Sequence, residues 1–197
     1  MTSVDVDTRR HRRRLLDGLA ASITSGGFRD TTVADIVRRA RTSRRTFYEH
    51  FSSREECLIA LLADANRSMI QQISEAVDPR APWALQVRQA IEAWIACAES
   101  EPAITLSWIR DVPALGASAR ELQRDAMEGF IAMTQRLTDT PSLRAEGISP
   151  PSRQLAIMLL GGLRELIATT VEDGGRAGDV TELAVRASIA LLGPATT

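Results

Sequence analysis

Residues 31–51, TTVADIVRRARTSRRTFYEHF, decide the fold of this chain because they contain two short helices separated by a tight turn. The apolar residues of the first helix follow the i, i+3, i+4, i+7 spacing of a single helix face: Val33, Ile36, Val37 and Ala40. Thr32, with Asp35 three residues later, has the pattern of a capping box that begins this helix.

The second helix begins after Ser43, a favourable N-cap residue, and its buried side is predicted to hold Phe47 and Phe51. Only Arg41 and Thr42 separate it from the first helix. Two short helices joined by such a turn form a DNA-binding unit, whose second helix lies in the major groove. The stretch therefore predicts a helix-turn-helix DNA reader.

Several dipeptides and tripeptides in and around this stretch occur in a characteristic order: Gly27-Phe28, Thr31-Thr32-Val33, Ile36, Ser43, Thr46-Phe47-Tyr48, His50-Phe51 and Arg54-Glu55. In their order and spacing they resemble the N-terminal signature of the TetR family of bacterial transcriptional regulators, over residues 9–62 or so. The resemblance implies an all-α fold with a three-helix DNA-binding domain, residues 1–55, and a helical-bundle domain for ligand binding and dimerisation, residues 56–197.

Three residues depart from the family pattern, which usually has Gly, Val and Gly at the positions of Arg41, Thr42 and Arg45. A residue other than glycine in a left-handed turn costs about 1 kcal/mol, so Arg41 is expected to strain the turn slightly. Arg45 places a long bidentate donor near the start of the recognition helix, within reach of guanine O6 and N7.

The resemblance also implies a set of DNA-contacting residues: Thr32, Ser43, Arg44, Arg45, Thr46, Tyr48, His50 and Arg54. We expect Arg44 and Arg45 to read base edges. We expect Thr32, Tyr48, His50 and Arg54 to hold phosphates and set the register. The alternative for Tyr48 is packing in the core, and the alternative for Arg54 is a solvated charge.

The charge distribution suits a DNA-binding head on an acidic body. Residues 1–56 hold 12 Arg against 8 Asp and Glu, a net +4, whereas residues 57–197 hold 12 Arg against 17 acids, a net −5. An arginine cluster, residues 9–14, opens the first predicted helix, residues 8–25. This cluster is either a solvated tail or an arm that contacts phosphate or a flanking minor groove.

The rest of the chain predicts further helices, about nine in all, with a loop over residues 139–151. The last two helices, residues 152–172 and 179–192, have apolar residues on two faces, so each needs cover on two sides. We expect their second faces to form a homodimer, as in the resembled family; the alternative is a central position in a monomer. The candidate interface residues are Leu155, Leu159, Gly162, Leu163, Leu166, Leu183, Ala187 and Leu191.

A twofold dimer presents two recognition helices about 34 Å apart or more, which predicts a palindromic operator in double-stranded DNA. Regulators that resemble this chain are mostly repressors that a small-molecule effector releases from DNA. The candidate pocket residues are large or adaptable side chains on the middle helices: Trp94, Trp108, Met127, Phe130, Met133 and Met158. Each of these also fits plain core packing.

Residue patterns argue against enzymatic and metal chemistry. The two histidines, His11 and His50, lie in the arginine cluster and the recognition helix, with no Glu-x-x-His or His-x-x-x-His pairing. We therefore expect no catalytic residues, no metal and no cofactor. The N-terminus, MTSVDVDTRRHRRR, lacks the apolar core of a signal peptide and no run of eighteen apolar residues occurs, so we expect a cytoplasmic protein without membrane contact. Two alternatives remain: an architectural DNA-binding protein without an effector, and a helical small-molecule-binding protein or enzyme.

Overall fold

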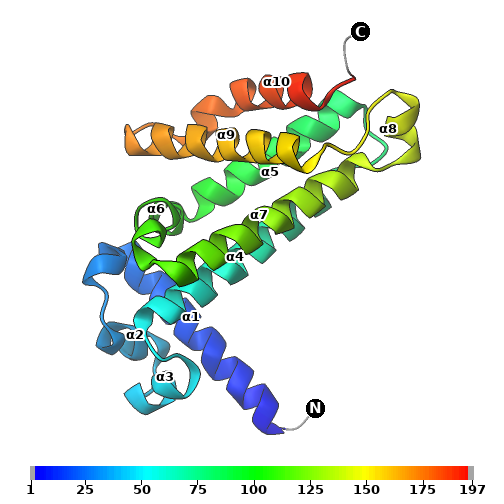
Figure 1. The fold of residues 1–197 in the computed structure, drawn as a ribbon. Helices are drawn as coiled ribbons and strands as arrows, with labels where there is room; N and C mark the ends of the chain where they lie inside the picture. Colours follow the sequence, from blue (N-terminus) through cyan, green and yellow to red (C-terminus); the bar gives the residue numbers. More distant parts are fainter. Residues whose placement is uncertain (1–2, 195–197) are drawn as a thin grey trace. The chain divides into compact units, whose positions relative to one another are not determined.

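The computed structural model describes residues 3–194, and the side chains of residues 7–194. It is helical and contains no strand within the described residues, which confirms the all-α prediction (Figure 1). The α-helices are α1 (Ser3–Asp30), α2 (Val33–Ala40), α3 (Arg44–His50), α4 (Arg54–Ala76), α5 (Trp83–Ser100), α6 (Pro102–Arg110), α7 (Ala117–Thr138), α8 (Pro141–Ala145), α9 (Arg153–Glu172) and α10 (Thr181–Leu192). Two 3₁₀ turns, η1 (Val112–Leu115) and η2 (Ala177–Val180), complete them.

The chain forms two compact units, each with its own core. The first, unit 1, comprises residues 1–65 and 102–122, and the second, unit 2, comprises residues 66–101 and 123–197. Unit 1 thus contains α1 to α3, the first half of α4, α6 and the start of α7. Segments distant in sequence therefore complete the N-terminal unit.

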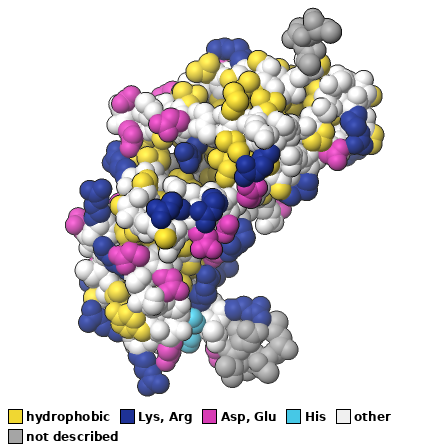
Figure 2. All heavy atoms as spheres, in the orientation of Figure 1, with side chains coloured by type: hydrophobic (Ala, Val, Ile, Leu, Met, Phe, Trp, Pro, Cys, Tyr) yellow, Lys and Arg dark blue, Asp and Glu magenta, His cyan; other side chains and the backbone are white. Residues whose placement is uncertain are grey.

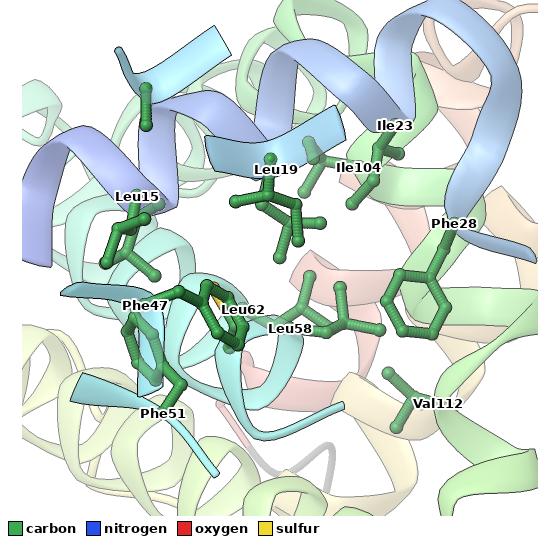
Figure 3. Packing of buried hydrophobic residues seen from close by; sticks show 14 of the residues in the cluster. Leu15, Leu19, Ile23, Phe28, Phe47, Phe51, Leu58, Leu62, Ile104 and Val112 are labelled. Carbon is green, nitrogen blue, oxygen red and sulfur yellow. The ribbon is translucent and has the colours of Figure 1, made fainter. Parts of the chain in front are cut away.

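Buried side chains from α1, α2, α3, α4, α6 and α7 form the core of unit 1, part of which is shown in Figure 3. Leu15 and Leu19 of α1, Phe47 of α3 and Leu58 of α4 are all completely buried there. Val112, next to α6, is also completely buried in the same cluster. The helix-turn-helix stretch is thereby packed on α1 and α4.

The core of unit 2 lies between α5, α9 and α10. Ile91 and Ile95 of α5 pack with Leu163 of α9 and Val185 of α10. Outside this cluster, Ile131 of α7 packs with Ala156 and Leu160 of α9. Helix α9 therefore has apolar neighbours on two sides.

Two elements differ from the sequence prediction. Helix α1 spans Ser3–Asp30, longer at both ends than the predicted helix over residues 8–25, and it is broken at Gly27, which has φ 77°. The predicted loop 139–151 contains the short helix α8, which Thr140 caps by accepting a hydrogen bond from the Leu143 amide and which Pro141 opens.

Candidate functional site

Helix α2 begins at the capping box that the sequence predicts. The Thr32 hydroxyl accepts a hydrogen bond from the Asp35 amide at 3.2 Å, and the Asp35 carboxylate accepts one from the Thr32 amide at 3.1 Å. The Thr32 hydroxyl, which donates to the Asp35 carboxylate at 2.6 Å, lowers the pKa of Asp35 below its usual value, and the Thr32 amide and Arg38 add to the effect. The start of α2 is therefore determined by residues adjacent to it in the sequence.

The turn between α2 and α3 depends on a residue in the left-handed conformation. Arg41 has φ 50°, and it is the one residue other than glycine with positive φ in the described part of the chain. Its amide donates to Arg38 O and the Thr42 amide donates to Val37 O, which satisfies the last carbonyls of α2. Arg14 of α1 donates to the Arg41 carbonyl oxygen at 2.6 Å and so ties the turn to the first helix.

Recognition helix α3 is held by its caps and by one buried side chain. The Ser43 hydroxyl accepts a hydrogen bond from the Thr46 amide at 3.0 Å. Phe47 is fully buried, while Tyr48, at 58% exposure, turns its ring edge-on to Phe47 and points outward. The alternative that Tyr48 packs in the core is therefore wrong. The solvent-facing side of α3 carries polar groups.

The two candidate base-reading arginines are both exposed but differ in their partners. Arg45 Nε lies 3.1 Å from Glu49 Oε1, one helical turn further on. Arg44 forms no ion pair with any described residue. A guanidinium held through Nε keeps its two terminal nitrogens for a bidentate contact, which is the geometry that guanine recognition requires.

His50 is half-buried at the end of α3, beside the arginine-rich helix α1. Burial of the imidazole, followed by the positive charge of His11, lowers the pKa of His50 below its usual value; Glu49 opposes this shift. The lowered pKa favours the neutral imidazole, whose ring N–H is the group available for the predicted phosphate contact.

Arg54, at the start of α4, reaches across to the end of α1. Its Nη1 donates to the carbonyl oxygens of Phe28, Arg29 and Thr31 at 3.1, 3.1 and 2.6 Å. Its guanidinium carbon lies 4.7 Å from the centroid of the Phe28 ring. These contacts hold the Arg54 side chain against residues 28–31. Arg54 therefore helps to position the helix-turn-helix, in addition to its predicted phosphate contact.

We predict that Arg54→Ala destabilises the protein in the absence of DNA by about 2 kcal/mol, because hydrogen bonds from a charged donor contribute about 1.5 to 3 kcal/mol. Urea unfolding of the free protein measures this loss. Arg44→Ala, at an exposed position, serves as the control and leaves the unfolding midpoint unchanged. An Arg54→Ala variant as stable as the parent would limit Arg54 to contacts with DNA.

A second site lies within unit 2, where a partly open cavity lies between α4, α5, α7, α9 and α10; the empty space in it and at its mouth is about 630 Å³. Of the predicted pocket residues, the structure places three on its wall: Trp94, Phe130 and Met133. Trp108 packs in the core of unit 1 instead, and Met127 packs beside the cluster of Ile131. Met158 is 66% exposed on the surface of α9.

The predicted dimer residues also separate into two groups. Leu159 and Leu163 are buried in the core of unit 2 and line the cavity. Leu183 and Leu191 are exposed on α10, and Gly162 is exposed on α9. The remaining residues are partly exposed: Leu155, Leu166 and Ala187. On the face shown in Figure 2, apolar side chains gather over the region of α9 and α10.

No group of three or more potential metal ligands occurs in the described residues. Burial raises the pKa of the Cys57 thiol to about 12, which makes it a packing group rather than a nucleophile. The arrangement in unit 1, by contrast, is that of a helix-turn-helix domain, with a short recognition helix whose exposed side carries arginine, tyrosine and hydroxyl groups.

Comparison with known proteins agrees with this class. Residues 15–61 match the family model described as bacterial regulatory proteins, tetR family. No curated protein sequence matches the chain. The N-terminal helix-turn-helix is therefore a TetR-family domain, as the sequence predicts.

Solved structures extend the likeness to almost the whole chain. A putative TetR-family transcriptional regulator from Syntrophomonas wolfei has a TM-score of 0.75 at 15% identity, over 94% of this chain and 96% of that one. FadR from Bacillus subtilis in complex with stearoyl-CoA has a TM-score of 0.75 at 14% identity, over 93% and 99%. Reduced NemR from E. coli has a TM-score of 0.71 at 15% identity, over 94% and 100%. The chain has the fold of TetR-family transcriptional regulators.

Proposed function

We propose that this protein is a sequence-specific DNA-binding regulator of transcription, most simply a repressor that a small molecule releases from a palindromic operator. The observation that carries the proposal is recognition helix α3, which buries Phe47 and leaves Arg44, Arg45 and Tyr48 exposed. Side chains at the N-terminal end of such a helix are those that reach base edges. The proposed DNA-binding domain spans residues 1–55, and residues 56–197 bind the effector and the second subunit.

Selection of duplexes from a random library at about 150 mM salt tests this function, because that salt concentration suppresses binding through phosphates alone. The expected result is a palindromic sequence whose half-sites lie on one side of the duplex. Recovery of no common sequence would instead support an architectural DNA-binding protein. The cavity in unit 2 already argues for an effector, since a purely architectural protein has no use for it.

Within that operator, Arg45→Ala is expected to weaken binding by about 1 to 3 kcal/mol and to relax the preference at one base position. The reason is that the variant lacks the guanidinium that would make the bidentate base contact. Glu49 orients this guanidinium in the free protein. Fluorescence anisotropy with single-base operator variants measures both effects. Arg136→Ala, an exposed arginine of α7, is the matched control. Equal losses on all duplexes would reassign Arg45 to phosphate contact.

The proposed homodimer uses the exposed faces of α9 and α10. Helix α9 is apolar and long enough to cross a membrane by length and composition alone, yet only 28% of its most apolar window is buried. Met158, Leu183 and Leu191 expose large apolar side chains on these two helices. A Cβ atom at Gly161 or Gly162 would meet nothing within 4 Å. Since neither glycine has a side chain, a second chain can approach the α9 backbone closely at these positions. A helix–helix contact of this kind covers the apolar surface without a membrane.

Sedimentation equilibrium is expected to give a dimer for the parent protein and a monomer for the double variant Leu183→Glu, Leu191→Glu, because two desolvated carboxylates oppose association. Leu85→Glu, at an exposed apolar position of α5, is the control that keeps the dimer. A monomeric parent protein would contradict the proposed interface.

We place the effector in the cavity of unit 2. FadR from Bacillus subtilis, which shares this fold, is solved in complex with stearoyl-CoA. An effector lowers operator affinity only if it prefers the protein conformation that fits the operator poorly, typically by about 1 to 3 kcal/mol of coupling. A regulator of this kind acts in the cytoplasm and catalyses no reaction.

A further inference from the structure

The wall of the cavity in unit 2 has an unusual chemistry for a binding site, because none of its eighteen lining residues carries a charge. Fourteen of them are apolar, and the four polar ones are Gln86, Thr134, Thr138 and Ser188. What these four groups still offer a ligand decides which chemical class the cavity accepts.

All three wall hydroxyls use their hydrogen within their own helix. Thr134 donates to Phe130 O at 2.9 Å, Thr138 donates to Thr134 O at 2.8 Å, and Ser188 donates to Ala184 O at 2.7 Å. A hydroxyl has one hydrogen and two lone pairs. These groups can therefore accept a hydrogen bond from a ligand but have none left to donate.

The side-chain N–H groups of Gln86 are likewise already used in hydrogen bonds within the protein. Its Nε2 donates to the carbonyl oxygens of Ala81 and Pro79, at 2.8 and 3.4 Å. Its Oε1 accepts no hydrogen bond from any residue in the described part of the chain. The indole N–H of Trp83 lacks an acceptor among the same residues, but protein atoms cover it. The wall thus presents acceptors without accessible donors.

An anionic group inside this cavity would lose its hydration and find neither a cation nor an N–H donor in exchange. Burial of an unpaired carboxylate is among the most costly events in a protein interior. A hydrocarbon surface, by contrast, gains from contact with the apolar wall, where the rings of Trp94 and Phe130 lie 6.1 Å apart.

We infer that the effector is an uncharged, largely hydrocarbon molecule with a hydroxyl group as hydrogen-bond donor, and that its anionic counterpart is rejected. This inference rests on the proposed function, since it concerns the effector site of the same regulator. The hydroxyl donates to the free Gln86 oxygen or to one of the wall hydroxyl oxygens, while the hydrocarbon part contacts Trp94, Phe130 and Met133.

Three probes of equal chain length test the inference on the full-length protein: 1-decanol, decanoate and decyl methyl ether. The protein carries Trp108→Phe, so that the two remaining tryptophans, Trp83 and Trp94, both line the cavity and report binding by fluorescence. We expect 1-decanol to bind at least tenfold more tightly than decanoate at pH 7.5, and several-fold more tightly than the ether. Calorimetry on the unmodified protein checks the same order.

A pair of alanine variants on α5 locates the binding. Ala90 lines the cavity, whereas Ala84 is exposed outside it. Ala90→Leu is expected to reduce 1-decanol affinity at least fivefold, and Ala84→Leu to leave it unchanged. If Ala90→Leu fails to fold, the order of the three probes on the parent protein still decides the inference.

Decanoate binding as tightly as 1-decanol, or no binding by any probe, overturns the inference. Operator binding is measured separately without a probe, which keeps the two proposals distinct. A protein that binds its operator and is released by decanoate alone retains the proposed function and loses this inference. A protein that prefers 1-decanol but selects no operator retains the ligand class and loses the proposed regulator.

Discussion

Phe47→Ala is expected to lower the free energy of unfolding by about 3 to 5 kcal/mol, the usual cost of emptying a fully buried aromatic site. The effect matters for function because α3 has only seven residues, too few for a helix to persist alone in water. Phe47 is the one buried residue that helix carries. Its ring lies 5.8 Å from that of Phe51, and both face α4 (Figure 3).

Urea unfolding and operator titration together measure this prediction. Phe47→Leu, which keeps most of the apolar volume, is the matched control and should lose about 1 kcal/mol. Tyr48→Ala, at the neighbouring exposed position, should leave the unfolding free energy nearly unchanged. Equal destabilisation by Phe47→Ala and Tyr48→Ala would mean that the recognition helix is not anchored through its buried side.

Gly18→Ala is the second large effect that we expect, at about 3 kcal/mol of destabilisation. A Cβ atom at Gly18 would lie 2.8 Å from Ile36 O and 3.0 Å from the Ala40 amide nitrogen. Both neighbours are backbone atoms of α2, so no side-chain rotation relieves the contact, and α2 must move away from α1. Operator affinity should fall with stability, because α2 supports the turn before α3.

Gly26→Ala provides a control of opposite sign in the same helix. A Cβ atom there meets nothing within 4 Å. Alanine loses less backbone entropy than glycine when a helix forms, so this change should stabilise the protein by about 0.5 to 1 kcal/mol. Thermal unfolding of the two variants measures both changes. A mild effect of Gly18→Ala would show that α1 and α2 are less closely packed than their backbone distances indicate.

The sequence predicted the helix-turn-helix accurately because its signals are local. Thr32 and Ser43 cap α2 and α3 as expected, and Arg41 has the left-handed conformation expected of the turn. Each of these features depends on residues at most four positions apart. Spacing alone also identified Phe47 and Phe51 as the buried side of the second helix.

The cavity wall was harder to predict, because periodicity identifies an apolar face but not the element that covers it. Trp108 has the size and chemistry of a pocket residue, yet α6 belongs to unit 1 and buries it there. Met158 lies on α9 with Leu159, but one is exposed and the other faces the cavity. Gln86 had no sequence signal at all, since its role depends on carbonyl groups of the preceding loop.

For Arg54, sequence reasoning considered only phosphate or solvent, because its partners lie more than twenty residues away in the chain. The signal that could have pointed to them is Gly27, whose presence indicates a break in the first helix and hence carbonyl groups without helical partners.

That break has an evolutionary consequence. Gly27 has φ 77°, a conformation that other residues adopt only with strain, and it turns the chain so that Phe28 enters the core. The turn leaves the carbonyls of Phe28 and Arg29 available to Arg54. Arginine at position 54 is therefore expected to depend on glycine at position 27. Among relatives, glycine at the first position and arginine at the second should be inherited or lost as a pair.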